Sequence, residues 1–317
     1  MSDNVKLDRL TPSAIAELKK RSFKSWWLVS IFQLLALSPH RVRQTLGSML
    51  GGLGRLLMGR RRHIVQRNLA LCFPDKSAKE QHQLFKMHFR ALGQSIIDRG
   101  VLWFGTTDQI RDLVQVEGRH HADEVLRQNG RIMLLAPHFV GLDAAASRLT
   151  LDGPTGATLY SAQSDPDVDA LVRLGRGRFH EVNLISRRGG IRTLLRHIEQ
   201  RTPIYYLPDM DFGRKGAVFV PFFGVMAATQ TAPAQLAQQF NMSVIPVLCF
   251  WNAATGRYKL EMLAPLVDFP GPDDLTTATA RLNALLEQWV TRHPEQYYWV
   301  HRRFKTRPEG EKSPYTT

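Results

Sequence analysis

The sequence predicts an α/β fold with a mixed, largely parallel sheet flanked by helices, preceded by an N-terminal membrane-associated helical segment. Two patterns indicate the sheet. Short continuous apolar runs are typical of strands that are covered on both faces, and helical patterns alternate with these runs along the chain. A Trp-led apolar run behind a cluster of basic residues indicates the membrane-associated segment. The apolar share of 44% is sufficient for a sizeable core.

The expected elements divide the chain into an N-terminal segment over 1–60, a main domain over 61–310 and a tail over 311–317. Strands are expected at 132–136, within 153–161, and at 182–185, 203–208, 243–251 and 258–263. Helices are expected within 81–104 and at about 186–201, 231–240 and 277–292. Ligand sites in such folds lie at the carboxyl ends of the strands.

The N-terminal segment is apolar over stretches that are short for a membrane span. The run WWLVSIFQLLAL holds 12 uncharged residues from Trp26 to Leu37, whereas a spanning helix needs roughly 20. A second run from Leu46 is interrupted by glycines and Arg55, and three arginines follow at 60–62. These features favour a helix that lies on the inner leaflet; an ordinary core helix is the alternative. The polar first residues lack the apolar run of a secretory signal.

The charge balance restricts the classes of partner. The chain has 42 Lys+Arg against 28 Asp+Glu, a net charge of +14, which favours nucleic acid, anionic lipid, a phosphorylated substrate or an acidic protein. Nucleic acid is disfavoured because no nucleic-acid-binding motif is present and the aromatic residues lie in apolar runs. The two isolated cysteines, Cys72 and Cys249, predict reduced, buried thiols. We expect no metal and no cofactor.

The segment APHFVGLD places a histidine after a buried-type strand, on a loop that enters a helix. Asp143 follows His138 by five residues, but about one such pair is expected by chance, so the spacing alone is not informative. In this context, a carboxylate can hold one ring nitrogen while the other accepts a proton. No GxSxG motif accompanies the pair, so the nucleophile would be a substrate hydroxyl. The alternative is a capping histidine with an acid at a helix N-terminus.

Two other segments offer side chains for substrate contacts. Arg176 and Arg178 crowd the sequence RLGRGRF, where glycines allow close backbone approach and arginine forks suit phosphate oxygens. The segment YYLPDMDFGRKG follows another strand end beside the expected histidine loop. We expect one of its aspartates to hold a basic side chain and its basic residues to face an anion. Its candidate residues are Asp209, Asp211, Gly213, Arg214 and Lys215.

Taken together, these segments resemble the late, or secondary, acyltransferases of lipid A biosynthesis, the lauroyl/myristoyl transferase group of the lysophospholipid acyltransferase superfamily. The matching pieces stand in the family's order and cover the chain from about residue 25 to 308. They are RRHIVQRNLALCFPD (61–75), APHFVGLD (136–143), GRGRF (175–179), YYLPDMDFGRKGAVFVPFFGVMAAT (205–229) and EQYYWVHRRFKTRP (295–308).

The resemblance implies that the domain over 61–310 is an acyltransferase. It would transfer a fatty acyl chain from acyl carrier protein to a hydroxyl of a 3-hydroxyacyl chain on a Kdo-bearing lipid A precursor. It would work at the cytoplasmic face of the inner membrane, with anionic inner-membrane lipid as a further partner. His138 would be the general base and Asp143 its orienting carboxylate, where many relatives carry Glu. The residues implied to bind substrate are Arg176, Arg178, Asp209, Asp211, Gly213 and Arg214.

Some alternatives remain open at this point. A sister acyltransferase could use the same motifs on a lysophospholipid, an amino-acid lipid or a glycolipid. A more remote possibility is a non-enzymatic basic protein that binds membrane or nucleic acid. The apolar run at 218–229 is consistent either with a wall of an acyl-chain slot or with a buried core strand.

Overall fold

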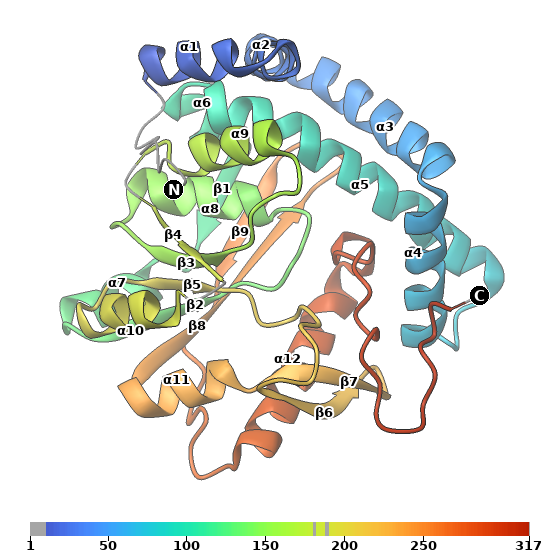
Figure 1. The fold of residues 1–317 in the computed structure, drawn as a ribbon, viewed down its shortest axis with the longest axis vertical. Helices are drawn as coiled ribbons and strands as arrows, with labels where there is room; N and C mark the ends of the chain where they lie inside the picture. Colours follow the sequence, from blue (N-terminus) through green and yellow to red (C-terminus); the bar gives the residue numbers. More distant parts are fainter. Residues whose placement is uncertain (1–10, 180–181, 188–189, 317) are drawn as a thin grey trace.

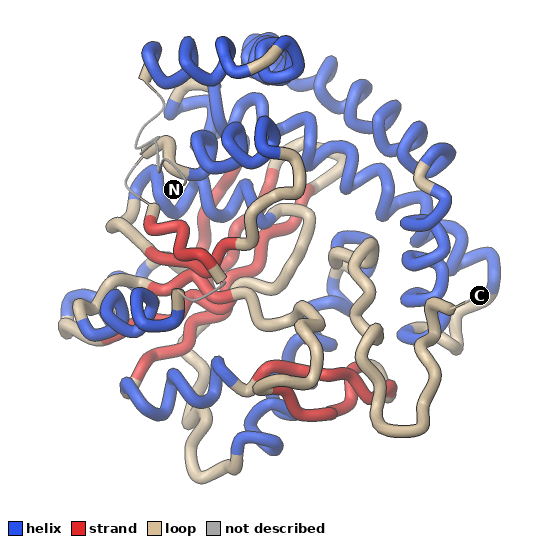
Figure 2. Tube along the Cα trace, viewed as in Figure 1, coloured by secondary structure: helices blue, strands red, loops and turns tan. Residues whose placement is uncertain are grey.

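The computed structural model describes residues 11–179, 182–187 and 190–316. Its centre is a seven-stranded sheet in the order β1-β9-β8-β2-β5-β3-β4, with helices around it (Figures 1 and 2). Neighbouring strands are parallel except β8 and β9, so the predicted mixed, largely parallel sheet is confirmed. The strands are β1 (Val114–Glu117), β2 (Arg131–Leu135), β3 (Ala157–Tyr160), β4 (Asn183–Ser186), β5 (Ile204–Tyr206), β8 (Met242–Trp251) and β9 (Tyr258–Met262).

The helices fall into an N-terminal group and a group interleaved with the strands. The N-terminal group comprises α1 (Pro12–Arg21), α2 (Phe23–Leu37), α3 (His40–Leu57), α4 (Gly59–Cys72), α5 (Ala78–Phe104) and α6 (Thr107–Leu113). The second group comprises α7 (His120–Arg127), α8 (Leu142–Asp152), α9 (Pro166–Arg176), α10 (Ile191–Glu199), α11 (Ala232–Phe240), α12 (Leu275–Arg292) and the short 3₁₀ turn η1 (Pro294–Gln296).

Each apolar run that predicts a strand contains one. The strand β1 is missing from the expectations because its sequence, VQVE, is only four residues long and alternates in polarity at the sheet edge. The helix expected from residue 186 begins at Ile191 in α10. Residues 188 and 189, which the prediction placed in that helix, lie outside the described part of the chain.

Strand β2 lies at the centre of the sheet and contributes to a core on each face. Met133 and Leu135 are buried in one core cluster, which includes residues of α11 and α12. Ile132 is buried in the other, which includes residues of α7 and α8. Because successive side chains of a strand point to opposite faces, the continuous apolar run fits a strand covered on both sides. The chain after β2 therefore leaves the sheet near its middle.

The apolar run at 218–229 forms a separate antiparallel hairpin of β6 (Ala217–Phe222) and β7 (Val225–Gln230). This hairpin contacts α12, and Phe222 and Ala227 are fully buried in the core cluster on that side of the sheet. These contacts favour the core interpretation of the run, and no residue of 218–229 is among those that line the central cavity.

Helices α2 and α3 follow the outside of the molecule, and α5 runs beneath them (Figure 1). The helix α3 packs against α5 through glycines: a Cβ on Gly51 would lie 2.3 Å from the Phe89 carbonyl oxygen. Its apolar side chains are left on the outside at three-four spacing, namely Val42, Leu46, Met49, Leu53, Leu56 and Leu57. Among the described residues, no helix is both long enough and apolar enough to cross a bilayer.

Candidate active site

His138 is held by Asp209, which reaches it from the neighbouring strand. The imidazole Nδ1 lies 2.7 Å from Asp209 Oδ1, and the backbone N–H of His138 donates to Asp209 Oδ2 at 2.9 Å. The sheet register explains this contact. Leu135 of β2 pairs with Tyr206 of β5 in parallel, and the two site residues each follow their strand by three positions. Parallel neighbours thus bring the two loops together at the carboxyl edge of the sheet.

This contact fixes which nitrogen of His138 is free. Burial raises the pKa of Asp209, but the neighbouring His138 and its hydrogen bonds outweigh burial and leave that pKa below its usual value. An ionised carboxylate only accepts, so Nδ1 carries the hydrogen and Nε2 keeps its lone pair. Nε2 has no hydrogen-bond partner among the described residues, is not sealed in the interior, and belongs to a side chain that lines the central cavity.

The structure does not pair Asp143 with His138 as predicted, because Asp143 binds two arginines instead. Its Oδ2 accepts from Arg99 Nε at 2.8 Å, and its Oδ1 accepts from Arg176 Nε at 2.9 Å. Burial raises the pKa of Asp143, but the two guanidinium groups lower it to about 2. Both arginines also line the cavity. Asp143, in the first turn of α8, therefore binds Arg99 and Arg176. The carboxylate that contacts the ring of His138 is that of Asp209.

Two predicted substrate-binding arginines contact other parts of the protein. Arg178 donates to the carbonyl oxygens of Leu102 and Gly105 at the end of α5, and it is not among the residues that line the cavity. Arg214 donates to the carbonyl oxygen of Arg307 at 2.6 Å and likewise lies outside the cavity lining. We therefore assign both side chains a role in fixing loops, and Arg176 remains the arginine candidate from the RLGRGRF segment.

Asp211 and Gly213 shape the loop that carries Asp209. Both carboxylate oxygens of Asp211 accept from Thr306, at 2.7 Å from its N–H and 2.8 Å from its hydroxyl, and Asp211 Oδ1 also accepts from the Gly213 N–H. Gly213 has φ +93, a backbone conformation that favours glycine. These contacts tie the loop to the KTRP segment near the C-terminus, so the two residues support the site indirectly.

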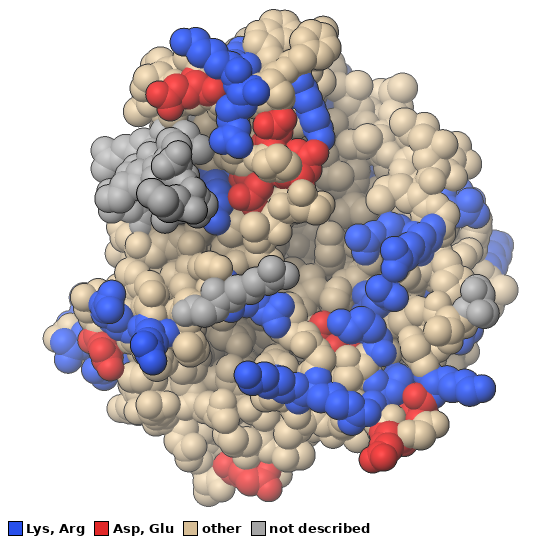
Figure 3. Space-filling view, viewed as in Figure 1, with Lys and Arg blue, Asp and Glu red and all other residues tan. Residues whose placement is uncertain are grey.

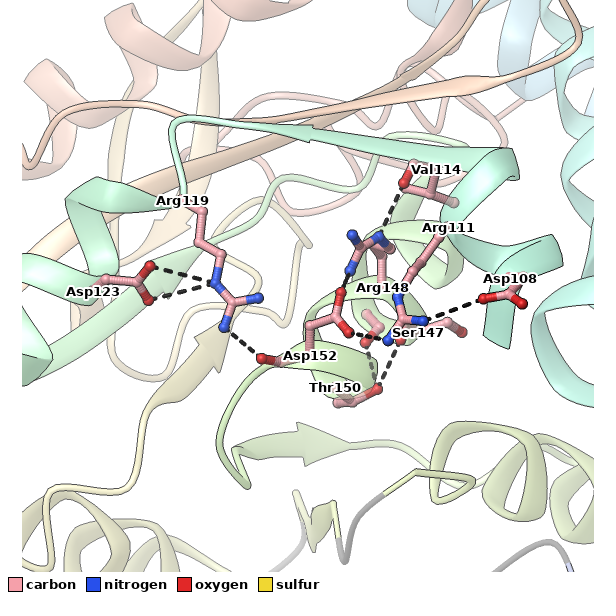
Figure 4. A network of polar contacts seen from close by, with 10 residues as sticks. Asp108, Arg111, Val114, Arg119, Asp123, Ser147, Arg148, Thr150 and Asp152 are labelled. Carbon is pink, nitrogen blue, oxygen red and sulfur yellow. Dashed lines mark hydrogen bonds and ion pairs between the residues drawn. The ribbon is translucent and has the colours of Figure 1, made fainter. Parts of the chain in front are cut away.

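The central cavity has a volume of about 1110 Å³ and extends from His138 along the face of the sheet covered by α7 and α8. Its apolar part is lined by Leu126, Ile132, Leu134, Leu149 and Met262. Charged side chains lie at the far end of α8, where Asp152 accepts from Arg111 at 2.9 Å and also binds Arg148 (Figure 4). Since α8 rises about 1.5 Å per residue, this network lies about 13 Å along the helix from Asp143.

Sequence reasoning missed Arg99 and His301. Arg99 lies in the C-terminal part of the long helix α5, where its charge looks like part of a solvated face. His301 lies within the HRRFKTRP segment, which carries the family resemblance but offers no spacing that links it to residue 138. For Asp209, a signal was available: two acidic residues follow a strand that borders the histidine strand.

A histidine held by a carboxylate, a pair of arginines and a cavity with an apolar wall are features that suit an enzyme acting on an anionic lipid. The sequence comparisons give the family. The model of the bacterial lipid A biosynthesis acyltransferases matches residues 13–306. The chain belongs to this family and is an acyltransferase, so the interpretation as a non-enzymatic basic protein is wrong.

Curated relatives align over nearly their whole length. The lipid A biosynthesis lauroyltransferase of Escherichia coli (strain K12) is 33% identical over 98% of this chain and 100% of its own. A lipid A biosynthesis acyltransferase of Haemophilus influenzae is 34% identical over 98% of both chains. The lipid A biosynthesis myristoyltransferase of E. coli (strain K12) is 30% identical over 93% of this chain and 91% of its own.

Proposed function

We propose that this protein transfers a fatty acyl chain from acyl carrier protein to a hydroxyl of a 3-hydroxyacyl chain on a Kdo-bearing lipid A precursor. The observation that carries the proposal is the pairing of His138 Nδ1 with Asp209, which leaves Nε2 free on a residue that lines a cavity with an apolar wall. The names of the relatives, which include lauroyl-, palmitoleoyl- and myristoyltransferases of lipid A biosynthesis, support the choice of substrates.

In the proposed reaction, His138 Nε2 removes the proton of the acceptor hydroxyl as its oxygen attacks the thioester carbonyl carbon. The tetrahedral intermediate then collapses, the carbon–sulfur bond breaks, and the imidazolium returns the proton to the departing thiolate. Asp209 stabilises the imidazolium and fixes the ring. A positioned base of this kind contributes roughly 10²–10⁴ in rate.

The arginine pair is proposed to hold the acidic part of the acceptor. Arg99 and Arg176 are joined through Asp143, and their side chains keep 31% and 25% of their surface exposed. The cluster has a net positive charge, and guanidinium forks suit the phosphates and carboxylates of a Kdo-bearing lipid. In this proposal Asp143 holds both arginines beside the base, which retains a substrate-positioning role for Arg176.

The acyl chain is proposed to lie in the apolar part of the cavity, along β2 from His138 towards Ile132. Leu134 and Ile132 line this part from the sheet, and Leu149 lines it from α8. Arg119, Asp123 and Arg148 of the charged network around Asp152 (Figure 4) also line the cavity, and we propose that this network limits the apolar part. Because each buried methylene contributes about 0.8 kcal/mol, the length of this lining would select the chain that is transferred.

Residues 1–60 are proposed to hold the enzyme on the cytoplasmic face of the inner membrane, ahead of the acyltransferase domain at 61–310. The exposed apolar stripe of α3 and the exposed side chains of Phe23, Leu34 and Leu37 on α2 support an interfacial position. Lysines and arginines flank both helices, which suits anionic lipid.

Acyl carrier protein is proposed as the donor because the net charge of +14 favours an acidic partner. Lys and Arg side chains gather beside and below a hollow on the face drawn in Figure 3, so an acidic carrier could approach the cavity from this side.

Mass spectrometry of lipid A from cells with and without the gene tests the proposal. Deletion should remove one defined acyl chain from lipid A, and the wild-type gene should restore it while the His138→Ala gene should not. Unchanged lipid A together with a lost acyl chain on a phospholipid, amino-acid lipid or glycolipid would overturn the proposed acceptor.

A further inference from the structure

Four backbone amides beside His138 already donate hydrogen bonds within the protein. The His138 N–H donates to the Asp209 carboxylate, and the Phe139 N–H donates to the Pro137 carbonyl oxygen. The Val140 N–H donates to the Gln296 carbonyl oxygen, and the Leu142 N–H donates to the Phe139 carbonyl oxygen. The intermediate of acyl transfer nevertheless develops a negative oxygen, which needs a donor in place before the reaction. These four amides do not supply that donor, so a side chain of the residues that line the cavity is a candidate for it.

His301 is tied to His138 through a single residue. The Tyr298 N–H donates to the His138 carbonyl oxygen at 2.8 Å, and the His301 N–H donates to the Tyr298 carbonyl oxygen at 3.1 Å. Both histidines are among the residues that line the central cavity. The imidazoles are also held by one loop, because Asp209 binds the ring of His138 and the Asp211 N–H donates to Nε2 of His301 at 3.0 Å.

The contact with Asp211 fixes the form of the His301 ring. A nitrogen that accepts a hydrogen bond carries no hydrogen, so Nε2 is bare and Nδ1 of the neutral ring carries the N–H. Burial lowers the pKa of His301 to about 4, and the charge of His138 adds to this effect. Among the described residues, Nδ1 of His301 has no hydrogen-bond partner, and it is not sealed in the interior.

We infer that His301 is a second catalytic residue, whose Nδ1–H donates a hydrogen bond to the carbonyl oxygen of the acyl thioester as negative charge develops on it. The inference rests on the proposed function. His138 takes and returns the proton, whereas His301 keeps its own proton throughout and only donates a hydrogen bond. The two imidazoles thus have opposite roles, which their opposite tautomers allow.

Two substitutions separate this role from a role in holding the loop. In His301→Asn, the amide nitrogen can take the place of Nδ1 as a donor, but the acceptor for the Asp211 N–H is lost. In His301→Gln, the amide oxygen reaches the place of Nε2 and accepts from Asp211, but the donor is lost. Each variant is assayed with wild-type protein, His138→Ala and the exposed control His82→Gln, using lauroyl, myristoyl and palmitoleoyl thioesters of acyl carrier protein and a Kdo-bearing lipid A precursor.

The inference predicts that the His301→Gln variant has the melting temperature of the wild-type protein. Its kcat should be roughly 10²–10³-fold lower, with little change in KM. His301→Asn should retain at least about tenfold more kcat than His301→Gln. A kcat for His301→Gln within roughly threefold of wild type, or equal losses in both variants, would overturn the inference. If His138→Ala is inactive while His301→Gln is active, only the role of His301 fails; wild-type activity in His138→Ala would refute the proposed base instead.

Discussion

Replacing Asp209 by asparagine should nearly abolish acyl transfer, although the change leaves the size of the side chain almost unaltered. The backbone N–H of His138 donates to Oδ2, so the amide oxygen of the new side chain must take that position. The amide nitrogen is then forced towards Nδ1, which lies 2.7 Å from Oδ1 in the wild type. Two donors cannot face each other there, so Nδ1 must give up its hydrogen. Nε2 then becomes protonated and cannot accept a proton from the substrate.

The Asp209→Asn variant should lose the activity that the general base contributes, and it also loses a charge-assisted hydrogen bond to His138. We expect kcat to fall roughly 10²–10⁴-fold, which is about 3 to 5 kcal/mol in the barrier, with a smaller change in KM. The assay follows the mass of the acceptor lipid after incubation with acylated carrier protein, and thermal unfolding checks the fold. Asp143→Asn is the matched comparison, since that carboxylate binds arginines and not the base. Full activity of the Asp209→Asn variant, with inactivity confined to the Asp143→Asn variant, would refute the assignment of the orienting carboxylate.

Three further changes test other parts of the site. Asp143→Asn should lower the free energy of unfolding by about 2 kcal/mol at pH 7, because a pKa lowered to about 2 stabilises the fold above about pH 4. Urea titrations should show this difference narrowing as the pH falls from about 4 towards 2, and an equal difference at all pH values would contradict it. Leu134→Trp should shift the preferred donor to a shorter chain in competition assays, because it fills the apolar part of the cavity; an unchanged preference would place the chain elsewhere. The double substitution Leu56→Asp/Leu57→Asp should weaken binding to anionic phosphatidylglycerol vesicles at least about tenfold, since these side chains are 64% and 73% exposed. The exposed Val267→Asp control should bind as the wild type does, and equal binding of all three proteins would exclude α3 as the contact surface.

The sequence was sufficient to predict most of the sheet and the position of His138. Continuous apolar runs such as the one before Pro137 indicate strands whose two faces are both buried. Such strands belong to a sheet that is covered on both sides. The edge strand β1 could not be predicted in this way, because VQVE is short and half polar. The antiparallel pairing of β9 with β8 depends on the order of strands in space, which a one-dimensional pattern does not contain.

The predicted pairing of His138 with Asp143 rested on the loop context and on the family resemblance, and neither of these fixes where the Asp143 carboxylate points. Asp143 begins a helix that turns its carboxylate towards Arg99 and Arg176. Asp209 is 71 residues away along the chain but three residues beyond the adjacent parallel strand. The sequence placed its loop beside the histidine loop, but the strand register that brings Asp209 itself to His138 becomes visible only when the fold is known.

The hypothesis that His138 deprotonates a lipid hydroxyl is tested most directly by one mass-spectrometric measurement. Purified wild-type and His138→Ala proteins, matched in melting temperature, are each incubated with lauroyl-, myristoyl- and palmitoleoyl-loaded carrier protein and a Kdo-bearing lipid A precursor. We predict that the wild type adds one acyl mass to the precursor and that the variant does so at least about 100-fold more slowly. Equal rates of acylation by the two proteins would contradict the mechanism.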